Sequence, residues 1–66
     1  MFAKAKTERA RQERRAKLMG GTRFYFVCDN GSAVAITAPS LAGAKAVLRE
    51  ERPGVTARVI AEMELT

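Results

Sequence analysis

Arg23–Ala38 reads RFYFVCDNGSAVAITA, and this stretch decides the fold. Its first part, Arg23–Cys28, is rich in aromatic and β-branched residues, which is typical of a β-strand. Asn30 and Gly31 follow in the order that a type I′ turn favours, and Ala33–Ala38 has the composition of a returning strand. We therefore predict a β-hairpin closed by a two-residue Asn-Gly loop.

The predicted loop sets which side chains of the hairpin share a face. It places Val27 opposite Val34 and Tyr25 opposite Ile36, while the two flanking phenylalanines of the first strand point to the other face. Both faces are then apolar, although antiparallel sheets with one wet side normally alternate apolar and polar residues. We predict that the face without the phenylalanines binds a partner or a second copy of the chain. Its residues are Tyr25, Val27, Val34, Ile36 and Ile60.

Downstream of the hairpin, Pro39 ends the second strand and Ser40 is suited to cap a helix. Residues 41–51 show the apolar spacing of an amphipathic helix, and Val55–Met63 alternates in the manner of a third strand. A right-handed crossover carries this strand back beside the first one. The sequence therefore predicts an α+β fold. A basic N-terminal helix precedes a ββαβ unit, whose three-stranded antiparallel sheet has the order 2-1-3 with one helix packed on one face.

Upstream of the hairpin the chain is strongly basic. Eight of the 12 Lys and Arg residues lie in the first 23 positions, together with two of the seven acidic residues. Ala3–Met19 consists mostly of good helix formers, and Gly20 and Gly21 follow as a helix end. Its apolar residues spread around the helix, so we expect no buried face and fraying in isolation. We predict a basic helical arm over residues 1–20 and a small body over residues 21–66.

This charge imbalance predicts a protein that binds a polyanion. Each Lys or Arg that neutralises a phosphate releases counterions, and the chain has no motif that reads bases. Binding to nucleic acid, or to a nucleoprotein complex, is therefore expected to be largely independent of sequence, with DNA and RNA both open. The predicted contacts are Lys4, Arg11, Arg14 and Arg15, which share one arc of the helix, with Lys6, Arg9, Lys17 and Arg23 in support.

A second class of function fits the same features. A small inhibitor or adaptor of phage or mobile-element type, similar in role to an anti-CRISPR protein, would dock on a host protein complex. Its contacts would be the arm, on an acidic protein surface, and the uncovered face of the sheet. The sequence favours a second copy of the chain as the occupant of that face, so a homodimer is expected. The alternatives are the arm folded back and unpaired bases stacked on the aromatic residues.

Several classes of function are not expected. The chain has no histidine and Cys28 is its only cysteine, which excludes His-based catalysis and an internal disulfide and argues against a zinc site. We predict no enzymatic activity, no metal and no cofactor. No apolar run approaches the roughly 20 residues of a membrane span, so no membrane partner is expected. The lone cysteine favours the reducing cytoplasm.

Overall fold

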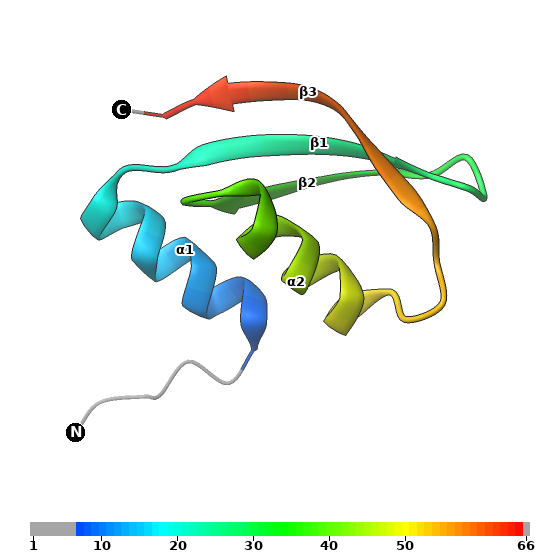
Figure 1. Cartoon of the computed structure of the whole chain (residues 1–66), viewed down its shortest axis with the longest axis horizontal. Helices are drawn as coiled ribbons and strands as arrows, with labels where there is room; N and C mark the ends of the chain where they lie inside the picture. The colour runs from blue at the N-terminus through cyan, green and yellow to red at the C-terminus, as the bar shows by residue number, and fades with distance from the viewer. Residues whose placement is uncertain (1–6, 66) are drawn as a thin grey trace.

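The computed structural model describes residues 7–65 of the chain. Along this range the elements are α1 (Glu8–Met19), β1 (Thr22–Cys28), β2 (Ala33–Ala38), α2 (Leu41–Glu51) and β3 (Ala57–Glu64). The strands form an antiparallel sheet in the order β2-β1-β3, and both helices lie side by side on one of its faces (Figure 1). The predicted α+β class, element order and sheet topology are confirmed.

The loop of the hairpin is one residue longer than predicted. The Gly31 N–H donates to the Cys28 carbonyl at 2.9 Å, and the Cys28 N–H donates to the Ser32 carbonyl at 2.8 Å. Residues 29–31 therefore form a three-residue loop, in which Gly31 adopts the left-handed conformation (φ 89°) common in loops of this length. The predicted two-residue turn, and the register built on it, are wrong.

One extra loop residue turns every side chain of β2 to the opposite face relative to β1. Phe24 pairs with Ile36 and Phe26 pairs with Val34, so these four side chains point to the same face of the sheet. That face is the one under the helices, because Ile36 is 0% exposed and Val34 packs against the core. The prediction that Val34 and Ile36 belong to an open partner face is therefore wrong.

The other face of the sheet carries the remaining residues of the predicted partner face. Tyr25 and Val27 alternate with the buried phenylalanines of β1 and are partly exposed. The β3 register slips by one residue between the partners of Tyr25 and Phe26, which marks a β-bulge, and Ile60 at this point is 57% exposed. Within residues 7–65, no helix covers this face (Figure 1).

The core lies between the sheet and α2. This helix is capped as predicted, since Ser40 Oγ accepts a hydrogen bond from the Gly43 N–H at 3.3 Å. From its apolar side, Ala44 and Val47 are buried against the strands. The buried cluster consists of Phe24, Phe26, Ile36, Ala38, Ala44 and Val47. The amphipathic face of α2 thus covers the face of the hairpin that holds the phenylalanines.

The N-terminal helix is packed onto the body, contrary to the expected absence of a buried face. Gln12 and Ala16, one turn apart, are its buried residues. A Cβ added to Gly21 would lie 2.5 Å from the Ala16 Cβ, and one added to Gly43 would collide with the Gln12 amide. Close contacts between small and polar residues therefore hold α1, and a search for an apolar stripe does not detect such contacts.

Candidate nucleic-acid interface

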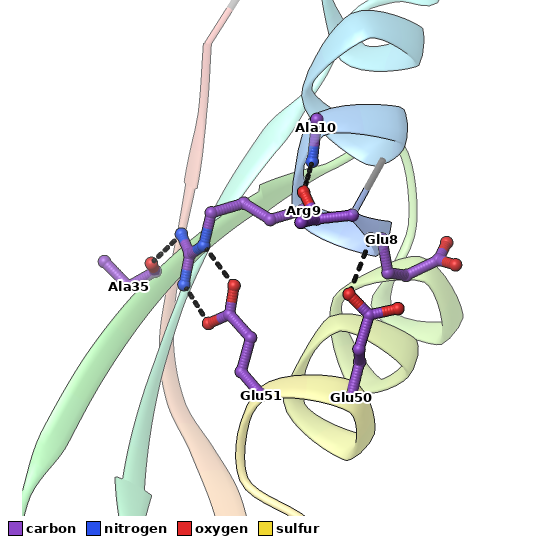
Figure 2. A network of polar contacts seen from close by, with 7 residues as sticks. Glu8, Arg9, Ala10, Ala35, Glu50 and Glu51 are labelled. Atoms are coloured by element: carbon purple, nitrogen blue, oxygen red, sulfur yellow. Dashed lines mark hydrogen bonds and ion pairs between the residues drawn. The ribbon is translucent and has the colours of Figure 1, made fainter. Parts of the chain in front are cut away.

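The first turn of α1 is clamped to the body by Arg9. Its guanidinium donates two hydrogen bonds to the Glu51 carboxylate, from Nε at 2.7 Å and from Nη2 at 2.8 Å. Nη1 donates to the Ala35 carbonyl at 3.2 Å, so the side chain joins α1 to both α2 and β2 (Figure 2). The guanidinium lowers the pKa of Glu51, and the carboxylate raises the pKa of Arg9. This predicted phosphate contact is engaged within the protein.

Glu50 contributes to the same junction, which is the contact between the start of α1 and the end of α2. Its Oε1 accepts a hydrogen bond from the Glu8 N–H at 2.9 Å (Figure 2). A carboxylate in the last turn of α2 opposes the dipole of its own helix, but here it meets the positive end of α1. Thr7 completes the cap, since its Oγ1 accepts from the Ala10 N–H at 3.1 Å. The helices therefore run antiparallel, with the start of α1 held on the end of α2.

Arg11 is a second predicted contact with a partner inside the chain. Its Nη2 donates to Glu8 Oε1 at 2.9 Å and lies 4.0 Å from Glu50 Oε2. Gln12 Nε2 donates to the other Glu8 oxygen at 2.7 Å. The hydrogen bond from Gln12, and then that from Arg11, lower the pKa of Glu8 below its ordinary value. Groups in the N-terminal half of α1 thus donate hydrogen bonds to three carboxylates, those of Glu8, Glu50 and Glu51.

The clamp between Arg9 and Glu51 is expected to weaken in acid. Because the pKa of Glu51 is lowered in the folded state, its contribution is complete above the ordinary value of 4.5 and is lost as the pH falls through the lower value. Both side chains are partly exposed, so Glu51→Gln should cost about 1 kcal/mol at neutral pH. Urea unfolding at several pH values measures this cost, which should decrease as the pH falls below 4.5 and through the lowered pKa of Glu51. A cost that does not change with pH would contradict an ion-pair contribution.

Two cations of α1 point into solvent on the side away from α2. Arg14 and Lys17 stand about 160° and about 140° around the helix from Gln12, which faces α2. Both are exposed, and neither makes an ion pair with another residue of the described range. Arg15 stands only about 60° from Gln12, where it lines a groove with Ala46 of α2. Arg14 and Lys17 are therefore open to an external ligand.

A hollow connects α1 to the open face of the sheet. It is lined by Glu13, Ala16, Lys17, Gly20, Gly21, Arg23, Thr37 and Leu65. Lys17 and Arg23 thus border one concave surface, and Glu13 contributes a carboxylate to the same surface. Arg23 is exposed, and it lies on the open face because it precedes the buried Phe24 in β1. The cationic surface therefore continues from α1, around the end of the helix, to the sheet.

The structure brings together only part of the predicted binding set. Lys17 and Arg23, which were predicted only in support, border one hollow. Arg14 is exposed about 60° around α1 from Lys17 and does not line this hollow. Lys4 and Lys6 lie outside the described residues.

Two exposed cations of α2 were missing from the predicted set. Lys45 and Arg49 stand about 160° and about 120° around α2 from Gly43, which faces α1. The amphipathic pattern of α2 already places them on its polar side, and this signal could have identified them. Their separation from the α1 cations follows only from the way the two helices pack.

The described part of the chain has no group of three acidic, cysteine or histidine side chains placed to hold a metal ion. Neither α1 nor α2 has the length and apolar character needed to cross a membrane. Comparison with protein-family models, curated proteins and solved structures finds no match to this chain. The interpretation of the cationic surface therefore rests on its own geometry and charge.

Proposed function

We propose that this chain is a non-enzymatic protein that binds nucleic acid, or a nucleoprotein complex, through Arg14, Lys17 and Arg23. The observation that supports the proposal is a division of charge within the molecule. The first turns of α1 occupy three carboxylates of the chain, whereas these three cations are exposed and unpaired within residues 7–65. Arg15, Lys45, Arg49 and Arg58 are also exposed and make no ion pair in this range, so the proposal selects the three cations that lie on α1 away from α2 and at the start of β1.

The chemistry of this surface suits phosphate groups. Lys and Arg side chains presented by a helix and a strand can each neutralise one phosphate and release its counterions. Phosphate contacts orient a protein on its ligand but carry no sequence information, so the binding is expected to be largely independent of sequence. Glu13 lies in the same hollow and opposes the attraction, so the ligand is expected to favour the Arg14 side of α1.

Replacing Arg14 and Lys17 by glutamine should weaken binding and reduce its dependence on salt. The loss of two phosphate contacts is expected to reduce the slope of log K against log salt for duplex DNA by about 2. The same loss should lower affinity near 0.1 M salt by roughly 10- to 60-fold. Fluorescence anisotropy with labelled duplex DNA, single-stranded DNA and RNA across a salt series measures both quantities.

The matched control is the Lys45→Gln/Arg49→Gln variant, which removes the same charge from α2. It should keep the slope of the wild-type chain, because both side chains face away from α1. Equal losses in the two double variants would contradict a localised surface and indicate attraction by net charge alone. Absence of wild-type binding to all three nucleic acids at low salt would reject the proposal.

A protein partner is the second candidate, and two apolar side chains at the end of α1 favour it. Leu18 is 81% exposed and Met19 is 75% exposed. Apolar groups beside cations are a common composition of protein-binding surfaces, as expected for an inhibitor or adaptor that docks on an acidic protein. This candidate takes precedence if the wild-type chain binds no nucleic acid.

The proposal also places the protein in the cytoplasm. Cys28 is the only cysteine of the chain, and its free thiol is buried. Unpaired thiols are typical of reducing compartments, where disulfides rarely persist.

A further inference from the structure

The open face of the sheet presents one aromatic ring between small neighbours. Tyr25 stands in the central strand β1 and pairs with Ala35 of β2 and Ala61 of β3. Directly paired residues share a face, so the phenol ring is flanked across the sheet by single methyl groups. Both alanines are exposed, and Tyr25 is partly exposed. The ring therefore has free space toward both neighbouring strands.

Positive charge borders this ring at both ends. Arg23 lies two residues before Tyr25 on the same face of β1, and Arg58 is the β3 partner of Val27, two residues after Tyr25. Both arginines are exposed, and neither makes an ion pair within the described range. Arg23 also lines the hollow that Lys17 borders. A nucleic-acid backbone whose phosphates bind along α1 would therefore continue onto the sheet beside Tyr25.

We infer that Tyr25 stacks on an unpaired base, so that the protein prefers single-stranded nucleic acid over a duplex. The inference rests on the proposed function, because Arg14 and Lys17 hold the phosphates that bring the base to the ring. An accessible aromatic ring beside cations that hold the backbone is the arrangement that binds single strands without sequence preference. A base inside a duplex is covered on both sides by its neighbours and does not reach the ring.

A second copy of the chain fits this face less well. The homodimer predicted from the sequence relied on Val34 and Ile36, which pack under the helices. Val27, Ile60 and Met63, the β3 partner of Arg23, add apolar area to this face, so charge and not apolar area decides between the two occupants. None of the residues paired with Arg23, Tyr25 or Val27 is acidic, so two such faces would bring arginines together without carboxylates. Charge complementarity therefore favours a phosphate chain.

Tyr25 itself reports on the contact, since it is the only tyrosine and the chain has no tryptophan. Oligothymidine and oligouridine of about 12 nucleotides should quench its fluorescence, and a duplex of the same length should not. Tyr25→Ala should weaken binding to the single strands by roughly 5- to 150-fold and leave duplex affinity unchanged. Tyr25→Phe keeps the ring and should keep most of the affinity. The two oligonucleotides distinguish DNA from RNA as the ligand.

The outcomes separate this inference from the proposed function. Equal wild-type affinity for single strands and duplex, with unchanged Tyr25 emission, would overturn stacking and leave phosphate binding by Arg14 and Lys17 in place. No binding to either ligand would remove both. Light scattering gives a further test, because a dimer that Tyr25→Ala converts to a monomer would assign the face to a second copy. The quenching is measured on the wild-type chain and does not depend on the stability of a variant.

Discussion

Phe26→Ala is expected to leave the chain largely unfolded. Phe26 is 1% exposed and lies in the central strand, paired with Val34 on one side and Val59 on the other. Truncation of a buried phenylalanine costs about 3–5 kcal/mol, because transfer free energy is lost and a cavity remains. A single core in a domain this short rarely supplies more than about 3–5 kcal/mol of stability, so little of it would remain.

The neighbouring position provides the control for this variant. Tyr25 is adjacent to Phe26 in β1 but points to the face without helices, so Tyr25→Ala should cost only about 1 kcal/mol. Urea and thermal unfolding followed by circular dichroism compare the two variants. If Phe26→Ala unfolds at the same urea concentration as Tyr25→Ala, the assignment of faces that follows from the three-residue loop is wrong.

Gly21→Ala is expected to displace α1 from the sheet. The added Cβ would lie 2.5 Å from the Ala16 Cβ and 3.3 Å from the Ala16 Cα. Neither atom belongs to a flexible side chain, so the helix has to move, and overpacking of this kind costs about 1–3 kcal/mol. Urea unfolding measures the loss, and amide hydrogen exchange in α1 should increase relative to exchange in β1.

A compensating variant tests whether this contact is the cause. Ala16→Gly removes the methyl group that the new Cβ would meet. The double variant should therefore recover part of the stability that Gly21→Ala loses, apart from the roughly 1 kcal/mol that glycine costs inside a helix. A double-mutant cycle measures the coupling between the two sites. Strictly additive losses would show that the Ala16–Gly21 contact does not hold the helix.

The position of α1 matters for the proposed function because it decides which cations are available. Arg9 and Arg11 are engaged by carboxylates at the junction with α2, whereas Arg14 and Lys17 face solvent. A displaced α1 would lose the junction and would no longer hold Lys17 beside Arg23. Gly21→Ala should therefore also weaken nucleic-acid binding, in proportion to the fraction of molecules in which α1 is detached.

Local sequence accounts for the elements of the fold. Aromatic and β-branched composition predicted β1 to within one residue of its start, and the bounds of Ala33–Ala38 and Leu41–Glu51 match the predicted ones. The Ser40 cap was recognised from the residue type and its position before an apolar pattern. The strand order followed from the handedness of the crossover. Composition and capping depend on a few neighbouring residues, and the crossover rule depends on the order of the elements along the chain.

The faces of the sheet could not be predicted in the same way. Asn-Gly suits a two-residue turn, but Gly31 serves equally well as the left-handed residue of a three-residue loop. The two loops differ by one residue in register, and local preference does not choose between them. Burial in the core favours the three-residue loop, because only this loop places Ile36 beside the phenylalanines under α2.

By itself, the sequence determined the secondary structure, the strand order and the concentration of positive charge before the hairpin. Only the tertiary structure decided which of these charges are available. Arg9 meets Glu51 across 42 positions of sequence, and α1 is held through Gln12 and Ala16, which no hydrophobic pattern marks. Charge is a property of single residues, but its availability depends on which carboxylates packing brings close. Such contacts join segments that are far apart in the chain, so local sequence patterns do not predict them.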